Sequence, residues 1–465
     1  MQSREIAAPR GMRMATSVRA ESRGPSGAAL AAPVPPRVSL SWLLRLGMCL
    51  SFVTAFLQYE TGVGIAQYLS LSFFACCGLL VLCGRQRTDR VQHILSGGGL
   101  WFAAVVFGEV VSYTSHDTYS EAYGILFIGV FFCARLVVQE MGIPNLLRAY
   151  SQAGFVTAIV VLISGRRAML ATDTGRFTGG TRAHPNLLSF ILGGFLPAIV
   201  WRAMEEKEPW RKRALILLSL ATFVFIFLTG SRGTLSAVLA AGACVLVRAL
   251  GGGRLLRFRI RRVHIIVLLI MIPLAATFLL AHNRIGHIAD FLNDFLSLSS
   301  SQRGLKSGLS GRTGIWNIAF RILRAHNRWL FGFGYRAGDR MVGTIDNGYV
   351  QLLFESGLIA GLMILGSMLR VFFLLWNASR MRENNAWTRY YMMLWSMMIV
   401  YFLNNVSTRY LFSFGSPFSL CVLCLMAASR QELVGGGIRA RVTQQVKPPS
   451  QAVVAESRAW NPPGD

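Results

Sequence analysis

Long apolar segments recur along the chain, separated by short polar segments that are rich in arginine. Each apolar segment is close to the roughly 20 residues that an α-helix needs to cross about 30 Å of hydrocarbon. The pattern predicts an all-α polytopic membrane protein with about twelve transmembrane helices. The predicted spans are 40–58, 62–83, 94–114, 119–138, 145–164, 185–202, 213–230, 233–250, 263–281, 347–376, 389–405 and 409–428.

The polar parts of the chain divide into two tails and a set of loops. Residues 1–38 and 431–465 are polar and contain several prolines, which predicts disordered tails on either side of a membrane domain at 39–430. Most loops are short, but residues 282–346 form one large loop whose second half is expected to contain short helices. A polytopic protein that keeps a large loop on one face commonly uses it for chemistry or recognition.

Basic residues orient the predicted spans. Arginine and lysine cluster in the loops after the second, sixth, eighth and tenth spans, which all fall on one side of a twelve-span arrangement. Because cytoplasmic loops carry the excess of basic residues, that side and both tails are predicted to be cytoplasmic. The 282–346 loop then lies on the outer face.

The composition agrees with a membrane protein and argues against a nucleic-acid-binding protein. The chain is 53% apolar and only 15% charged, with a net charge of +26. Such a charge is typical of nucleic-acid-binding proteins, but here the basic residues follow the loops, so no nucleic acid partner is predicted. The eight cysteines all lie in apolar spans, which indicates neither disulfides nor a metal site.

Three arginines predicted for the outer face lie beside helix starts. Arg182 comes just before the sixth span, Arg232 lies in the first turn of the eighth, and Arg312 lies in the first turn of a short amphipathic helix in the large loop, which Ser310 can cap. A helix N-terminus carries partial positive charge and free N–H groups. Together these residues predict a site for an anion such as a phosphate or diphosphate. The alternative is that each arginine is an interfacial anchor.

Other polar or aromatic side chains accompany these arginines. His184 and Asn186 flank the proline that starts the sixth span, and His184 is a candidate base, phosphate ligand or helix cap. Trp316 follows Arg312 by one turn on the apolar face of the amphipathic helix and is a candidate substrate contact. The segment Gly332–Tyr335 predicts a flexible turn, without the context of a phosphate-binding loop.

Asp346 and Asn347 begin the tenth span. Asp346 is either the helix cap or a carboxylate that accepts a proton from a sugar hydroxyl, and one side chain can do both. Glu355 lies about two and a half turns further along a membrane helix, where a carboxylate is costly, so it is a candidate functional residue that could pair with an arginine such as Arg232. No acidic cluster for a divalent metal and no nucleotide loop is present in the sequence, so no cofactor is predicted.

Five segments resemble the O-antigen ligase and O-antigen polymerase superfamily of bacterial envelope glycosyltransferases. They are GGTRAHPNLLSF (179–190), TGSRGTLSAV (229–238), SGRTGIWNIAF (310–320), FGFGY (331–335) and DNGYVQLLFESGLIAGL (346–362). The resemblance implies about twelve helices in the bacterial inner membrane and one large periplasmic loop. It also implies metal-independent transfer of a glycan from an undecaprenyl diphosphate carrier to an acceptor glycan or glycolipid.

The resemblance also implies roles for individual residues. Arg232 and Arg312 would bind the diphosphate and stabilise its charge as it leaves. His184 and Asn186 match the first outer motif of the family, and Arg182 joins them by proximity. Many ligases have His-Asn where this chain has Asp346 and Asn347, and a carboxylate is a weaker base than an imidazole. A ligase and a polymerase of the same fold therefore both remain open.

Two other classes of function compete with this interpretation. A twelve-span secondary transporter would show internal repeats and ionisable residues near the membrane midplane. No clear repeat of two halves is visible in the sequence, and the polar residues of interest lie on the outer face. A non-catalytic assembly protein of a polysaccharide pathway would tolerate the loss of Arg312 and Asp346.

Overall fold

The fold was analysed in a computed structural model, which describes residues 40–54, 63–83, 108, 110–111, 118–165, 177, 185–251, 312–379, 386–409 and 420–427. These residues form helices and connecting turns, with no strand in the described part of the chain. The predicted spans at 94–114 and 263–281, both tails and residues 282–311 of the large loop lie almost entirely outside it. The number of twelve spans therefore stays a prediction.

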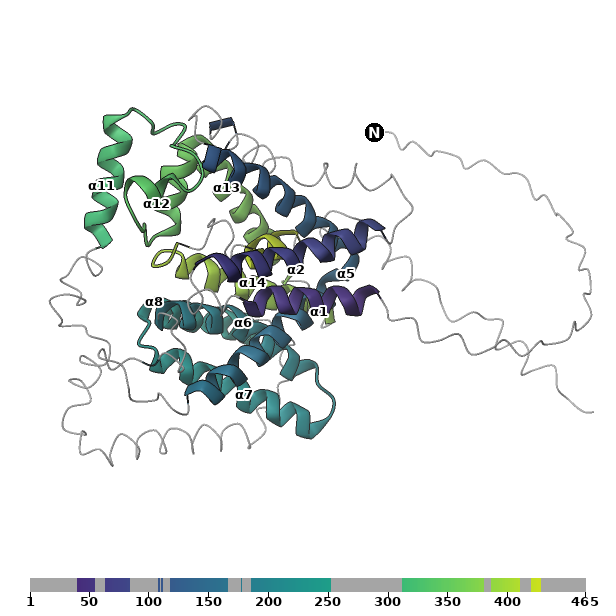
Figure 1. The fold of residues 1–465 in the computed structure, drawn as a ribbon. Coiled ribbons are helices and arrows are strands. Elements are labelled where there is room, and N and C mark those ends of the chain that lie inside the picture. The colour runs from purple at the N-terminus through teal and green to yellow at the C-terminus, as the bar shows by residue number, and fades with distance from the viewer. Residues whose placement is uncertain are drawn as a thin grey trace, which may run out of the picture. The chain divides into compact units, whose positions relative to one another are not determined.

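The helices follow the predicted apolar segments closely (Figure 1). They are α1 (Leu40–Val53), α2 (Val63–Cys83), α5 (Thr118–Gly165), α6 (Pro185–Glu205), α7 (Pro209–Leu228), α8 (Arg232–Gly251), α11 (Arg312–Ala325), α12 (Ala337–Met341), α13 (Gly348–Ala378) and α14 (Ala386–Asn404). Residues 420–427 are helical as well. Among the described helices, α5, α6 and α13 are long and apolar enough to cross a membrane.

Helix α5 corresponds to two predicted spans joined by a kink. A straight helix of 48 residues would be about 70 Å long, more than twice the hydrocarbon thickness. Gly142, at φ 71° and ψ 163°, breaks the helix, and Pro144 follows. Proline lacks an N–H and cannot continue the ladder of the preceding turn. Each half is therefore long enough for one crossing, as the sequence predicts.

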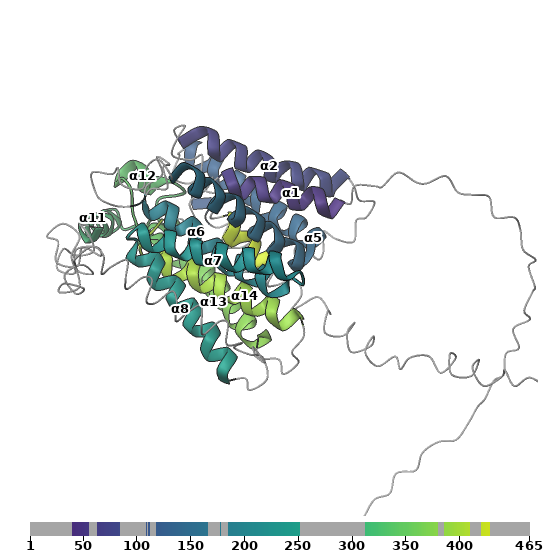
Figure 2. The ribbon, with the colours of Figure 1, turned by 90° about the horizontal axis from the view of Figure 1, so that it is seen from below.

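Helix α6 lies at the centre of the bundle. In its most apolar stretch 78% of the residues are buried, against 33% in α13, and it contacts α5, α7, α8 and α14. Glycines permit this close packing. A Cβ on Gly193 would lie 2.6 Å from Thr234 of α8, and one on Gly194 would lie 2.9 Å from the hydroxyl of Tyr401 on α14. Figure 2 shows the bundle around α6 from a second direction.

The outer surface of the bundle is apolar. Large apolar side chains are exposed on several helices, including Ile163 (69%), Leu217 (66%) and Leu362 (58%). Soluble proteins rarely expose contiguous apolar surface of this kind. Together with the long apolar helices, this surface indicates an integral membrane protein.

Helix α13 is broken at Gly357, and a loop fills the break. In a continuous helix the carbonyls of Phe354 and Glu355 would accept from the amides of residues 358 and 359. Here they accept instead from Phe333 N (3.0 Å) and Gly334 N (2.9 Å). In return, Leu358 N and Ile359 N donate to the carbonyls of residues 329 and 330 at 2.8 and 3.3 Å. The loop thus replaces the two helical hydrogen bonds that the break removes.

This contact corrects the prediction of a flexible turn at Gly332–Tyr335. Gly332 has φ 71°, and a Cβ there would lie 2.5 Å from the carbonyl oxygen of Glu355. Gly357 has φ 73°, and its Cβ would collide with the backbone of residues 330–331. The glycines are needed because two backbones meet without room for side chains. The segment is a structural junction between the loop and α13.

Candidate functional site

Arg312 lies in the first turn of helix α11, as the sequence predicts, and the helix packs on the bundle through its apolar face. Ala319 and Leu323 are fully buried in a small core with Ile345 and Phe354, next to α13. This core fixes the direction of α11 and therefore the position of the arginine in its first turn. The predicted amphipathic helix is confirmed, and it lies on the bundle.

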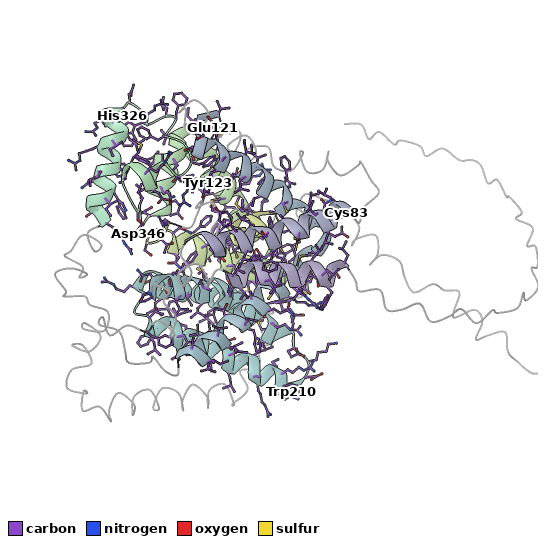
Figure 3. All side chains as sticks on the ribbon, in the orientation of Figure 1. Cys83, Glu121, Tyr123, Trp210, His326 and Asp346 are labelled. Carbon is purple, nitrogen blue, oxygen red and sulfur yellow. The ribbon has the colours of Figure 1, made fainter. Side chains whose placement is uncertain are left out.

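Arg312 and Asp346 lie together although they are far apart in the sequence. The Nε atom of Arg312 lies 3.8 Å from Oδ2 of Asp346, with the two side chains 19% and 42% exposed. Asp346 is therefore open to solvent at the point where α13 starts, and Figure 3 shows it beside the lower end of α11. A solvent-accessible carboxylate next to a guanidinium can take up a proton or contact a sugar hydroxyl.

Asn347, and not Asp346, caps α13. The side-chain oxygen of Asn347 accepts hydrogen bonds from Tyr349 N at 2.9 Å and Val350 N at 3.0 Å, and Asn347 is only 6% exposed. The prediction that Asp346 could be the cap is therefore wrong. The cap is one residue later because the backbone of Asn347 is the extended one that precedes the first helical turn. Asp346 is left without a capping role.

The start of α13 is joined to the turn at residues 404–409, which follows α14. Gly348 N donates to the carbonyl of Asn405 at 2.8 Å, and the hydroxyl of Tyr349 donates to the carbonyl of Phe402 at 2.9 Å. Helix α8 reaches the same turn, because a Cβ on Gly233 would collide with the hydroxyl of Ser407. Arg232 is the residue before Gly233. The structure therefore brings the helix starts that carry Arg232 and Asp346 to one turn.

A chain of hydroxyl groups connects α6 to the same place. Ser189 Oγ and Thr234 Oγ1 lie 3.0 Å apart, and Thr234 Oγ1 donates to Asn404 Oδ1 at 3.2 Å. Ser189 also donates to the carbonyl of Asn186 at 2.9 Å. Asn186, in the first turn of α6, thus lies close to the first turn of α8, as the shared anion site requires. Arg182 and His184 lie outside the described residues.

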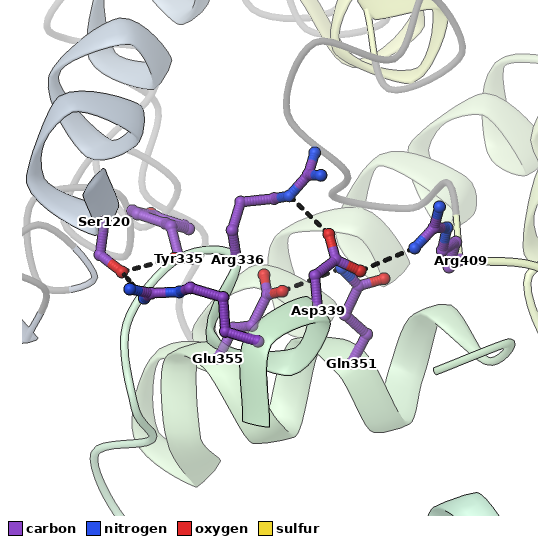
Figure 4. A network of polar contacts seen from close by, with 8 residues as sticks. Ser120, Tyr335, Arg336, Asp339, Gln351, Glu355 and Arg409 are labelled. Atoms are coloured by element: carbon purple, nitrogen blue, oxygen red, sulfur yellow. Dashed lines mark hydrogen bonds and ion pairs between the residues drawn. The ribbon is translucent and has the colours of Figure 1, made fainter. Parts of the chain in front are cut away.

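A second polar cluster, centred on Asp339 of α12, was missed by the sequence reasoning. Asp339 Oδ2 lies 2.7 Å from Arg336 Nε, and its Oδ1 accepts from Arg409 Nη1 at 2.7 Å (Figure 4). Arg336 has a left-handed backbone, at φ 61°. Because one carboxylate holds two guanidinium groups, it fixes α12 to the turn after α14. In the sequence, only the spacing Arg336-x-x-Asp339 indicates this cluster.

The same loop is anchored to the start of α5. Ser120 Oγ donates to the carbonyl of Tyr335 at 2.6 Å and accepts from Arg340 Nη2 at 2.9 Å. The rings of Phe127 and Tyr335 pack with centroids 5.7 Å apart. The loop is thereby held to α5 on one side and to the 404–409 turn on the other.

Glu355 is only 3% exposed and takes part in this cluster. Its Oε1 accepts from Gln351 Nε2 at 2.9 Å, a contact between residues four apart on one helix face. Figure 4 shows Glu355 beside Arg336 and Asp339 of the loop. The expected pairing with Arg232 is therefore replaced by a partner on the same helix. Glu355 lies just before the break at Gly357.

Trp316 packs against the small core of α11 and α13 and is half-buried. Its indole Nε1 is buried and finds no hydrogen-bond partner among the described residues. Buried indole N–H groups usually find a partner. Its role as a substrate contact remains a prediction.

The sequence was also compared with models of known protein families. A family model described as O-antigen ligase matches residues 216–365. The matched segment contains α8, α11, α12 and the first half of α13, and so includes Arg232, Arg312 and Asp346. No curated protein matches the chain. The match confirms the resemblance to the O-antigen ligase and polymerase superfamily over residues 216–365.

Proposed function

We propose that this protein is a glycosyltransferase of the O-antigen ligase type. It would move a glycan from an undecaprenyl diphosphate carrier to an acceptor sugar at the periplasmic face of the inner membrane. The observation that carries the proposal is the pairing of Arg312 with Asp346 beside the turn that α8 reaches with its first residues. The match to the O-antigen ligase family model supports a lipid-linked glycan as the class of substrate.

The proposed chemistry needs an anion clamp and a proton acceptor. The acceptor hydroxyl attacks the anomeric carbon of the donor glycan, the bond from that carbon to the phosphate oxygen breaks, and the diphosphate leaves on its lipid. Arg232 and Arg312, each in the first turn of a helix, stabilise the charge that develops on the diphosphate. Asp346 accepts the hydroxyl proton. A donor that carries its own activation needs neither a nucleotide nor a metal in this scheme.

The Arg312–Asp346 geometry supports shared use of one site. At 3.8 Å the two groups attract each other without a short hydrogen bond. A diphosphate can therefore take the guanidinium hydrogen bonds while Asp346 turns toward the acceptor. Charge-assisted bonds to phosphate are among the strongest polar contacts in proteins.

A polymerase of the same fold is the alternative, because it uses the same donor with a different acceptor. The presence of Asp346 in place of the histidine of many ligases keeps this alternative open. A ligase joins a finished polymer to a glycolipid, whereas a polymerase extends the polymer by repeat units.

The test is the envelope glycan profile of a deletion strain, with carrier-linked glycan measured in parallel. If the protein is a ligase, the deletion strain should accumulate full-length polymer on the undecaprenyl carrier. If it is a polymerase, the deletion strain should contain only single repeat units, on the carrier or on the final acceptor. An unchanged profile and an unchanged carrier pool would contradict both, and would favour a transporter or an assembly protein.

A further inference from the structure

A cavity with three arginines lies between helices at the end of the bundle remote from the candidate site. It measures about 360 Å³ and is lined by Arg45, Arg148, Ser151, Gln152, Phe155, Arg202 and Leu215. These residues come from α1, α5, α6 and α7. Helix α6 connects the two places, since Asn186 lies in its first turn and Arg202 in its last. At about 1.5 Å per residue these positions are about 24 Å apart.

The charge of this cavity is only partly compensated. Its lining contains three guanidinium groups and no carboxylate. Arg202 pairs with Glu206 at 2.9 Å, and Arg148 makes one long hydrogen bond of 3.4 Å to Asn145. No ion pair of Arg45 is seen among the described residues. Gathered guanidinium groups repel one another unless an anion joins them, so the cavity favours an anionic ligand.

The walls of the cavity point to a ligand with an apolar part. Phe155 is 45% exposed and lies with Leu215 beside the arginines. In the same turns of α1 as Arg45, Trp42 and Leu46 are also exposed, at 45% and 42%. Arginine heads beside exposed aromatic and aliphatic groups, near helix ends, are the arrangement found at the headgroup level of a membrane.

We propose that this cavity binds the phosphodiester headgroup of an anionic phospholipid. The guanidinium groups of Arg45, Arg148 and Arg202 hold the phosphate, Ser151 and Gln152 contact headgroup hydroxyls, and the acyl chains follow Phe155 and Leu215 into the bilayer. Basic pockets between membrane helices bind such headgroups by this chemistry. The lipid bridges α1, α5, α6 and α7, and so stabilises the bundle at this end. The proposal does not depend on the transfer reaction.

The test measures lipid binding by the purified full-length protein in detergent. Native mass spectrometry and the thermal midpoint are recorded with added phosphatidylglycerol, with phosphatidylcholine and with inorganic phosphate. We expect phosphatidylglycerol alone to bind and to raise the midpoint. Equal effects of both lipids would contradict selectivity for an anionic headgroup. An effect of inorganic phosphate equal to that of phosphatidylglycerol would overturn the proposal of a lipid ligand, because a free anion would then suffice.

Two triple variants locate the binding. The first changes Arg45, Arg148 and Arg202 to Gln, and the second changes Arg211, Lys212 and Arg213 of α7 to Gln. Both remove three positive charges near the same end of the bundle, but only the first set lines the cavity. We expect the first variant to bind phosphatidylglycerol at least about tenfold more weakly and the second to bind as the wild type does.

Equal losses in both variants would indicate diffuse surface attraction and would overturn the site. Wild-type binding by the first variant would overturn it as well. Should the first variant fail to fold, Arg148→Gln alone serves, because Arg148 is exposed and its loss leaves the packing intact. It should weaken phosphatidylglycerol binding severalfold, and unchanged binding would again contradict the proposal.

Discussion

At the scale of single residues, the pair of Arg312 and Asp346 gives the candidate site its chemistry. Each residue stands at a helix start, one at the first residue of α11 and the other just before the cap of α13. Their side chains meet at 3.8 Å. The small core under α11 holds the two helices in place, so the distance between cation and carboxylate is set by packing.

Removal of either proposed clamp arginine should abolish transfer. Arg312→Ala or Arg232→Ala removes a charge that stabilises the leaving diphosphate, and losses from such groups are commonly about 100-fold or more. Transfer is measured from a lipid-linked donor in membranes that contain equal amounts of each variant. Arg321→Ala, on the exposed side of α11, is the matched control and should transfer at the wild-type rate. Wild-type activity of both clamp variants would exclude the clamp.

The base and the cap can be separated by substitution, because they are different residues. Asp346→Asn should abolish transfer and leave the thermal midpoint unchanged, since Asn347 does the capping. Asn347→Ala should lower stability by about 1 kcal/mol through the loss of two capping hydrogen bonds, whereas Asn347→Asp should retain it. Thermal unfolding and transfer are measured on all three. Full activity of Asp346→Asn would leave Asp346 with no catalytic role.

The limits of prediction are visible in these same residues. The periodicity of α11 and the position of Arg312 were predictable, because helical spacing is local. Whether the cap is Asp346 or Asn347 depends on the backbone of one residue, and both types cap well. The cluster of Asp339 was not predictable, because it joins residues 70 apart whose approach only the tertiary structure sets.

At the scale of elements, the broken helix α13 organises the end of the bundle that holds the candidate site. The part after Gly357, residues 358–378, is by itself long enough to cross about 30 Å of hydrocarbon. The part before it, with Glu355 and Gln351, is packed against the loop and α12. The exposed side chains of Leu330 and Phe331 lie at the break beside those of Leu358 and Ile359. Glu355 therefore precedes the segment that is long enough to cross by itself.

Substitutions at two glycines test how much the junction between the loop and α13 contributes to stability. Gly332 and Gly343 both have positive φ, at 71° and 93°, so alanine is strained at either position. Only Gly332 lacks room, because the Cβ would meet Glu355 O at 2.5 Å, whereas nothing lies within 4 Å at Gly343. Gly343→Ala should cost about 1 kcal/mol, and Gly332→Ala should lower the thermal midpoint more than twice as far. Equal losses would mean that the junction does not constrain α13.

The apolar segments predicted the helices well but not their breaks. The span at 347–376 was expected as one helix, and nothing local in its sequence shows that the loop at 329–334 would replace two of its hydrogen bonds. Glycine in the segment around 357 allows a break, but other glycines of α13, such as Gly361 and Gly366, lie within regular helix. The difference comes from a tertiary contact.

At the scale of the whole membrane domain, polar contacts gather at two opposite ends. One end holds the candidate site and the Asp339 cluster. The other holds the arginine cavity and the ion pair between Arg389 and Glu205, at 3.0 Å. The topology predicted from the basic loops would put the first of these ends in the periplasm and the second in the cytoplasm. Figure 3 shows Asp346 at one end and Trp210 near the other.

The orientation of these ends is the last point on which the proposed function depends, and cysteine labelling tests it. In a variant without the eight native cysteines, Asn317→Cys on α11 and Lys207→Cys between α6 and α7 place one exposed thiol at each end. A membrane-impermeant maleimide should label Asn317→Cys in cells with a permeabilised outer membrane, and Lys207→Cys only after the inner membrane is broken. The reverse pattern would put Arg312 and Asp346 in the cytoplasm. It would then contradict periplasmic transfer, since the arginine-rich loops would be the translocated ones against the positive-inside rule.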